Sequence, residues 1–353
     1  MSSLLASCRA TITRAINPKR LVILATIGAA FLAIPPLARV PARLAAGCAE
    51  WIALAAALEL LSMLGFVLVF DLVFGLRLSA RRRLGAGFRA LAATAVLPAG
   101  GMVGPAVAAR TAGADATPLP VLARSTVALT ILTTAPSLLV LGGLGFALWL
   151  GWPRGPHGAL LTLPEAGVSV ILVAGVCLIG RCSQPLGVAT NGQPKFKRGR
   201  HLIATMALCR TGASEAWRLV ADRNWKLTGG IAYYALDNAV LWAAFQAYGR
   251  PPAISVIVMG YLVGSLGAVL PLPAGIGAVE GGLIGGLVLY GAPAAPSAAA
   301  VLLYRGISLS LPVTLGALSW CLVPERQFRH RIGRRRMRTA RLRSAEPAPA
   351  SLE

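Results

Sequence analysis

Long apolar segments that recur along the chain constrain its fold more than any other feature. Six of them are at least 18 residues long, at 21–38, 51–76, 121–150, 159–180, 225–248 and 297–323. A helix of about 20 apolar residues crosses the ~30 Å hydrocarbon core of a bilayer. Soluble helices are rarely apolar over such lengths, and the mean hydropathy of +0.70 also excludes an ordinary soluble domain. We therefore predict an all-α polytopic membrane protein with about six full spans.

Basic residues separate these segments and predict their orientation. The formal net charge is +22, and the basic positions gather in 77–89, 181–200 and 326–343, the last with nine arginines. Such clusters mark cytoplasmic loops by the positive-inside rule, and anionic lipid headgroups are their natural contacts. Because the charge is not interleaved with aromatic residues in a basic fold motif, a nucleic-acid partner is not expected. We predict a multi-pass protein of the cell (inner) membrane with both termini in the cytoplasm.

Two further apolar stretches, 90–110 and 253–290, are broken by proline and glycine. Each contains the sequence LPAG, at 97–100 and 272–275. Backbone groups released by such breaks are tolerated in a membrane only inside protein or beside a wet cavity, so we predict two re-entrant hairpins. The expected break positions are Pro98, Gly100, Gly101, Gly104, Pro271, Pro273, Gly275, Gly277, Gly281 and Gly282.

The recurrence of LPAG also suggests that the two halves are related. The three basic regions can all be cytoplasmic only if each hairpin returns to the side that it left. The first hairpin then opens from the cytoplasm and the second from outside, which is an inverted-repeat arrangement. The second hairpin could instead be two true spans, because 253–270 is nearly long enough to cross.

The predicted domain organisation is simple. One transmembrane domain covers 1–323, with halves at about 1–180 and 225–323 joined by a basic cytoplasmic linker, 181–224. Within the linker, 201–223 reads equally well as an interfacial helix or as a plain linker helix. The basic tail 324–353 is expected to be disordered and cytoplasmic.

Charged and polar residues inside the apolar stretches are the candidate site residues. Such groups are costly in a membrane and are usually paired, so Glu280 and Arg305 are expected to face each other. They form either a functional site or an ion pair that only ties two helices together. Asp237 and Asn238 either line a cavity or form hydrogen bonds between helices. Glu59 is a further carboxyl group within an apolar segment, and we interpret it as lining a cavity.

Arg110, at the end of the first hairpin, completes the candidate substrate-binding set. Its guanidinium could bind a lipid phosphate or could extend to the cytoplasmic surface.

The second hairpin and the last span carry a family resemblance. The sequence LPLPAGIGAVEGG, followed by AVLLYRGISLSLPVTLGAL, resembles the signature of the lysylphosphatidylglycerol synthase transmembrane domain, also called the flippase-like integral membrane family. The resemblance favours Glu280 and Arg305 as site residues. In the first half, LPAGGMVGPAVAAR matches at Pro98, Gly100, Gly101, Gly104 and Arg110, whereas Pro105-Ala106 stands where the family has a carboxylate.

The resemblance implies a lipid translocator for an anionic phospholipid or a lipid-linked intermediate. Arg305, Arg110 and the N-termini of the half-helices would hold the headgroup. The alternative is a membrane accessory factor or integral membrane enzyme of lipid or glycolipid biosynthesis that works with a separate soluble transferase.

Catalytic chemistry is not readable in the sequence. It has no nucleophile–base constellation or phosphate loop, and its six cysteines and three histidines are scattered, so no catalytic residue, metal site or cofactor is expected. Enzymes of the family that transfer aminoacyl groups carry a large soluble domain after the membrane part, whereas this sequence ends about 30 residues beyond the last span. We therefore expect that the chain is not itself an enzyme.

Overall fold

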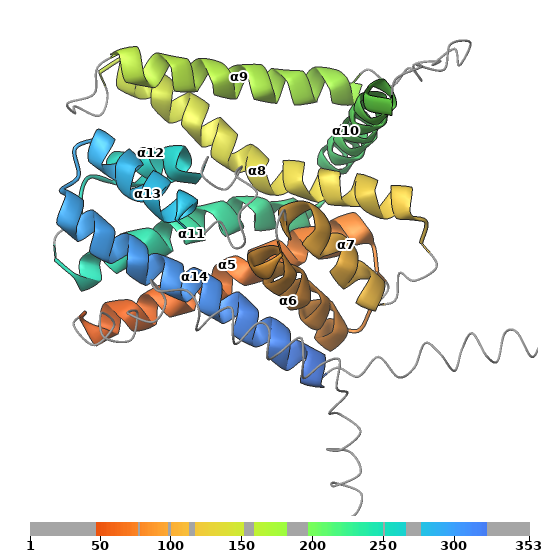
Figure 1. Cartoon of the computed structure of the whole chain (residues 1–353), viewed down its shortest axis with the longest axis horizontal. Helices are drawn as coiled ribbons and strands as arrows, with labels where there is room; N and C mark the ends of the chain where they lie inside the picture. Colours follow the sequence, from red (N-terminus) through yellow and green to blue (C-terminus); the bar gives the residue numbers. More distant parts are fainter. Residues whose placement is uncertain are drawn as a thin grey trace, which may run out of the picture.

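The computed structural model describes residues 47–76, 78–97, 100–112, 117–151, 159–181, 197–249, 251–265 and 277–322. Within these ranges every regular element is a helix (Figure 1). The expected all-α polytopic fold is thereby confirmed. The first apolar run 21–38, the tail 324–353, and the predicted break residues Pro98, Pro271, Pro273 and Gly275 lie outside the described residues.

Five of the helices correspond to the long apolar segments. They are α5 (Ala49–Phe74), α8 (Leu119–Trp149), α9 (Ala159–Arg181), α11 (Thr228–Ala247) and α14 (Ala294–Leu322). Of these, α5, α8 and α14 are long and apolar enough to cross a membrane by themselves. The helix α11 begins three residues later than expected, because Trp225–Leu227 forms a 3-10 turn, η1. The Asn224 side chain caps this turn by accepting the N–H of Lys226 at 3.0 Å.

Each broken stretch forms a pair of short helices. The first pair is α6 (Ala80–Val96) with α7 (Gly100–Ala112), and the second is α12 (Ile254–Ser265) with α13 (Ala278–Leu289). Both α12 and α13 have 12 residues, or about 18 Å of helix, which is too short for a ~30 Å hydrocarbon core. The described part of each helix is therefore shorter than a full span.

The first hairpin begins earlier than the sequence indicated. We expected a basic loop over 77–89 and a hairpin from Ala90, but α6 starts at Ala80 and includes the arginines at 81–83 and Arg89. Arg89 is buried, and its guanidinium donates to Ser319 of α14 at 3.2 Å through Nε. Most of the predicted loop is therefore the first half of a packed helix.

The long helices run alongside one another between two ends of the molecule (Figure 1). The pair α12–α13 lies at one end, and α6, α7 and α10 (Lys197–Ala221) lie at the other. At the first end the N–H of Cys48 donates to the carbonyl of Ala247 at 3.1 Å, and at the second end Lys226 contacts Asp71 at 2.5 Å. The helices α5 and α11 are therefore antiparallel partners over their full length.

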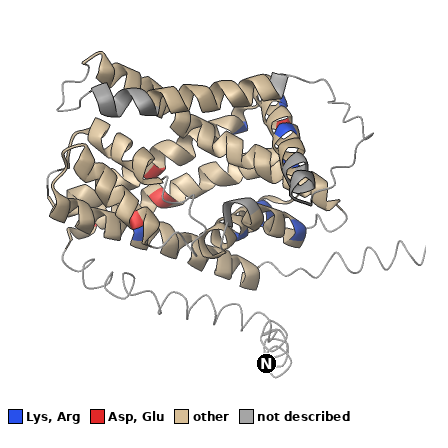
Figure 2. Ribbon diagram, turned by 45° about the horizontal axis from the view of Figure 1, so that its top comes forward, with Lys and Arg blue, Asp and Glu red and all other residues tan. Residues whose placement is uncertain are grey.

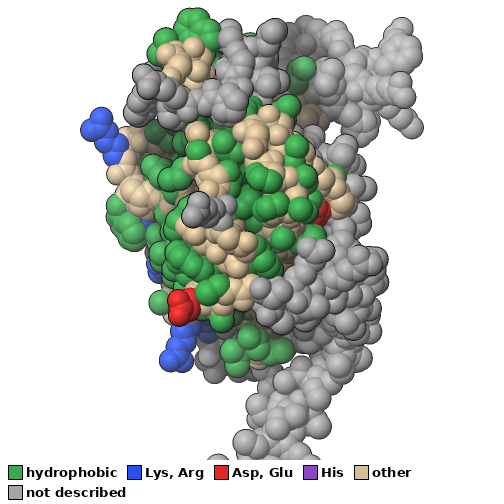
Figure 3. Space-filling model, turned by 90° about the vertical axis from the view of Figure 1, so that its left-hand side faces the viewer, with side chains coloured by type: hydrophobic (Ala, Val, Ile, Leu, Met, Phe, Trp, Pro, Cys, Tyr) green, Lys and Arg blue, Asp and Glu red, His purple; other side chains and the backbone are tan. Residues whose placement is uncertain are grey.

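Charge is distributed unevenly between these two ends. Figure 2 shows most of the described Lys and Arg residues at the end that carries α6, α7 and α10. Figure 3 views the opposite end, where the described surface is mainly apolar side chains and uncharged groups. The described part of the chain thus has one basic end, which we call the basic end below, and one apolar end.

The linker helix α10 lies against the bundle and not free of it. Glu215 forms an ion pair with Arg124 of α8 at 3.6 Å and another with Arg218 of its own helix at 2.6 Å. A Cβ placed on Gly212 would lie 2.4 Å from a methyl carbon of Val127, so α10 and α8 approach closely there. The predicted helix is confirmed; the described contacts place one face of it on α8.

Glycines allow the helices of the bundle to approach one another. A Cβ on Gly65 of α5 would lie 2.7 Å from the carbonyl oxygen of Gly229 on α11. In the second hairpin, a Cβ on Gly264 would lie 2.5 Å from the Cα of Leu283, and one on Gly282 would lie 2.7 Å from the carbonyl oxygen of Gly264. Small residues that permit such backbone contact are the usual basis of helix pairing in membranes.

Candidate functional site

The helix α13 begins at a residue whose backbone favours glycine. Gly277, its N-cap, has φ +83°. Three residues later, the Glu280 side chain turns back and its Oε2 accepts the Gly277 N–H at 2.6 Å. This bond satisfies one of the backbone donors that a helix start leaves without an intrahelical partner.

The second carboxylate oxygen of Glu280 connects this helix start to α14. Its Oε1 accepts the Nε–H of Arg305 at 2.8 Å, and the two side chains are only 12% and 13% exposed. The expected pairing of Glu280 with Arg305 is therefore present in the structure. One carboxylate fixes the start of α13 and also holds the middle of α14.

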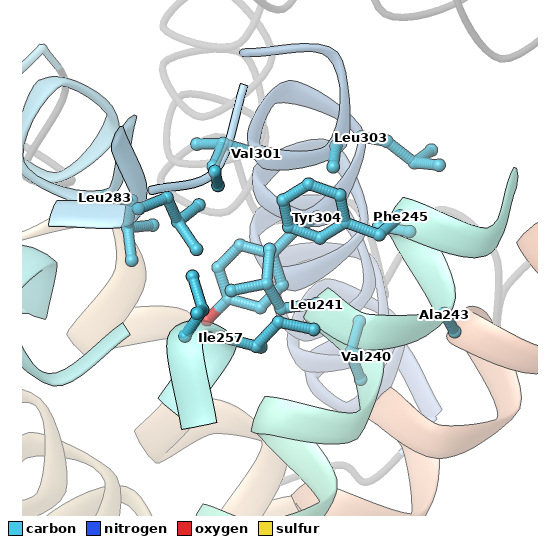
Figure 4. Close-up of a cluster of buried hydrophobic side chains, with 14 of the residues drawn as sticks. Val240, Leu241, Ala243, Phe245, Ile257, Leu283, Val301, Leu303 and Tyr304 are labelled. Atoms are coloured by element: carbon cyan, nitrogen blue, oxygen red, sulfur yellow. The ribbon is translucent and has the colours of Figure 1, made fainter. Parts of the chain in front are cut away.

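Asp237 lies buried in α11 and is bound by two tyrosines from other helices. The Tyr304 hydroxyl of α14 donates to Oδ2 at 2.9 Å, and the Tyr261 hydroxyl of α12 donates to the same oxygen. Figure 4 shows Tyr304 among side chains of α11, α12 and α13. Since Tyr304 and Arg305 are adjacent, α14 contributes to the Asp237 cluster and to the Glu280 pair from neighbouring positions.

Asn238 is buried beside Asp237 but bonds within its own helix. Its Nδ2 donates to the carbonyl of Tyr234 at 3.0 Å, whereas its Oδ1 has no hydrogen-bond partner among the described residues. The structure therefore places Asp237 in a contact between helices and leaves Asn238 with one local bond.

Arg110 lies apart from these residues. It is exposed in the last turn of α7, at the basic end, whereas α13 begins inside the bundle, where Glu280 binds Arg305 in the middle of α14. The candidate substrate-binding residues thus fall into one connected group on α11, α13 and α14 and one separate arginine.

The predicted break residues also fall into groups. Gly100 and Gly101 open α7, and Gly277 caps α13. Gly104 lies inside α7, where a Cβ would be 2.7 Å from the Thr94 backbone nitrogen of α6. Gly281 and Gly282 lie inside α13, one facing open space and one packed on α12. The glycines of each motif therefore serve close packing as well as the chain reversal.

Sequence reasoning missed the tyrosines of this site. Tyr261 and Tyr304 each stand alone in an apolar helix, and only the packing of α12 and α14 on α11 brings their hydroxyls to Asp237. The one available signal was the position of Tyr304 directly before Arg305 in a membrane segment.

The Arg305 guanidinium, which binds the Glu280 carboxylate, is a group that can also bind other anions. A guanidinium binds carboxylate and phosphate with similar geometry, so a phosphate could take the place of Glu280 on Arg305. Among the described residues, no three side chains of the His, Cys, Asp or Glu type are grouped to hold a metal ion.

Comparison with known families gives one match. Residues 20–316 match the family described as the lysylphosphatidylglycerol synthase TM region. The matched range includes both hairpins, the Glu280–Arg305 pair and all of α5 to α13. No curated protein matches the chain.

Proposed function

Because the chain belongs to the lysylphosphatidylglycerol synthase TM region family, a group of multi-pass membrane proteins linked to lipid biosynthesis and translocation, we propose that it is a lipid translocator. Its cargo would be an anionic phospholipid or a lipid-linked intermediate. The observation that carries the proposal is the pair of hydrogen bonds that the Glu280 carboxylate accepts at the start of a half-helix, one from Gly277 and one from Arg305.

The exchange at Arg305 gives a mechanism for binding a headgroup. A lipid phosphate that binds Arg305 would displace the Glu280 carboxylate. Because the same carboxylate also accepts the Gly277 N–H, its movement would free the cap of α13. The N-terminus of a helix favours anions, so the freed backbone donor could bind the phosphate as well. Headgroup binding would thereby loosen the N-terminus of α13 at Gly277.

The positions of the hairpins support movement between leaflets. The α12–α13 and α6–α7 pairs lie at opposite ends of the bundle (Figure 1), as an inverted-repeat arrangement requires. A headgroup entering beside α13 would leave beside α7, where Arg110 is exposed. The acyl chains would remain in the lipid, because only the headgroup needs a polar path.

The proposal includes an orientation and an environment. The basic end, with α6, α7 and α10, would face the cytoplasm of a cell (inner) membrane, in contact with anionic lipids. The chain itself would catalyse no covalent step, and any aminoacyl or glycosyl transfer would come from a separate soluble partner.

Leaflet exchange in vesicles tests the proposal directly. We expect the purified chain to accelerate the exchange of headgroup-labelled phosphatidylglycerol over protein-free vesicles, and Arg305→Gln to abolish most of this acceleration. Arg218→Gln is the matched control, since Arg218 is an exposed arginine paired with a glutamate at the basic end. Exchange no faster than in protein-free vesicles would contradict translocation. A lipid product that forms only when a soluble transferase is added would instead favour the accessory role.

A further inference from the structure

The register of α5 against α11 places two carboxyl groups at the same level. The Ser62 hydroxyl of α5 donates to the carbonyl of Tyr233 on α11 at 3.0 Å, which fixes one point of contact between the helices. Glu59 lies three residues before Ser62, and Asp237 lies four residues after Tyr233. Because the helices are antiparallel, both steps run in the same direction, by about 4.5 and 6 Å. Glu59 and Asp237 therefore lie opposite each other.

Glu59 is enclosed at this position. It is 5% exposed, and its Oε2 has no hydrogen-bond partner among the described residues. Asp237, which is 8% exposed, lies within electrostatic range of Glu59 and accepts two tyrosine hydroxyls. One carboxylate of the pair is thus well supplied with donors, and the other is not.

The hydroxyl groups that the neighbouring helices bring toward this pair of carboxyl groups do not neutralise the charge of Glu59. The helix α11 also presents the hydroxyls of Tyr233 and Tyr234, α12 that of Tyr261, and α14 that of Tyr304. These are neutral donors.

Three of the cations on the helices that pack around α5 form ion pairs with carboxylates other than Glu59. Arg305 of α14 binds Glu280 of α13, and it also acts on Asp237. From α6 and η1, Arg83 and Lys226 bind Asp71, which lies twelve residues from Glu59, or about 18 Å along α5.

Arg124 of α8 binds Glu215, and Arg89 of α6 binds Ser319 at the far end of α14. Each of these five cations therefore has an interaction with a group other than Glu59.

We propose that Glu59 and Asp237 form a proton-binding site that holds one exchangeable proton between them. Two buried negative charges at one level are unfavourable in a membrane interior, and one bound proton leaves the pair with a single charge. The tyrosine donors suit an ionised Asp237, and the unpartnered Oε2 of Glu59 suits the proton. Loading transfers one proton from water to a carboxylate oxygen and release returns it to water, so no oxidant or other reactant is needed.

The site is connected to the headgroup site through α14. Tyr304 bonds to Asp237, and the next residue, Arg305, is attracted by both Asp237 and Glu280. When the pair carries one proton, Arg305 is held mainly by Glu280. When the proton leaves, the additional negative charge competes for Arg305 and weakens the Glu280 bond. This coupling rests on the proposed lipid translocation, whereas the proton site itself does not.

Infrared difference spectroscopy tests the site without any lipid transport. For the full chain in vesicles, a pH change should alter a carbonyl band of a protonated carboxyl group, and ¹³C-labelled glutamate should shift that band in the unmodified protein. Glu59→Gln should remove it, and Glu50→Gln should keep it, because Glu50 is an exposed glutamate of the same helix. A band that ignores the label or persists in Glu59→Gln would overturn the proposal. A band that responds to sodium ions at constant pH and not to pH would overturn it too.

An imposed pH gradient tests the coupling. One pH unit corresponds to a tenfold bias for one proton, so lipid distribution between the leaflets should shift by up to about tenfold, and in Glu59→Gln this shift should disappear. A shift that remains in Glu59→Gln would contradict the coupling. If the infrared band behaves as expected while the unmodified protein exchanges no lipid, the proton site stands and the proposed translocation fails.

Discussion

Glu280 makes two bonds with one carboxylate, so its replacement should affect both α13 and α14. We predict that Glu280→Gln and Arg305→Gln each destabilise the protein by about 3–5 kcal/mol, because each leaves one nearly buried charge without its partner. The double variant should recover much of this loss. Thermal unfolding in detergent measures stability, and leaflet exchange of the same samples measures function.

The double variant also separates the two interpretations of the ion pair. A stable double variant that exchanges no lipid agrees with a headgroup site at Arg305. If the double variant is stable and exchanges lipid like the unmodified protein, the pair is structural and the assignment of the site is wrong.

Gly277 offers a second test at this scale, because its φ of +83° is unfavourable for any residue with a Cβ. Gly277→Ala should destabilise the protein by about 1–2 kcal/mol, although no atom lies within 4 Å of the added methyl group. Gly281→Ala is the matched control. It lies in helical backbone with open space around it and should gain up to about 1 kcal/mol. Equal melting temperatures for the two variants would contradict a strained helix start.

At the scale of elements, the α12–α13 hairpin depends on contact between two backbones. Gly282→Ala places a methyl group 2.7 Å from the carbonyl oxygen of Gly264, and the helices must separate to admit it. We predict a loss of about 1–3 kcal/mol in the free energy of unfolding. Gly285→Ala, three residues further along α13 and facing open space, should not destabilise. Thermal stability measured for both variants distinguishes packing from helix propensity; similar losses would argue against close contact.

The sequence predicted the long helices well, because apolar runs end where charged or turn-forming residues begin. The expected span 51–76 became α5, Ala49–Phe74, and 159–180 became α9, Ala159–Arg181. The boundary at 77–89 was wrong, because the arginines at 81–83 and Arg89 lie in helix α6, and Arg89 itself binds Ser319 of α14. Arginine-rich sequence indicates membrane side but does not distinguish a loop from a helix.

The candidate site was only partly predictable for a related reason. Glu280 and Arg305 could be paired from the sequence, since opposite charges in a membrane interior must be compensated. The partners of Asp237 depend on the relative register of three helices, and a single sequence does not contain that register. The opposition of Glu59 and Asp237 emerges only from the antiparallel contact of Ser62 with Tyr233.

At the scale of the whole molecule, the ends of the long helices explain why each hairpin returns to the side that it left. The helix α5 ends at the basic end, and α8 starts there, so α6–α7 must return to the side from which it began (Figure 1). In the same way α11 ends, and α14 begins, at the apolar end, with α12–α13 between them. The two hairpins therefore lie at opposite ends of the bundle, and neither changes the side on which the next span begins.

This arrangement predicts the accessibility of single cysteines in a chain whose own cysteines have been replaced. Ala253→Cys, at the apolar end, should react with a membrane-impermeant thiol reagent in intact cells. Asp222→Cys, an equally exposed position at the basic end beside η1, should react only after permeabilisation, because basic segments stay in the cytoplasm. Reaction at Asp222→Cys from outside would reverse the proposed orientation. Reaction of both positions from the same side would be inconsistent with α11 as a membrane span, and with it the placement of the two hairpins in opposite leaflets.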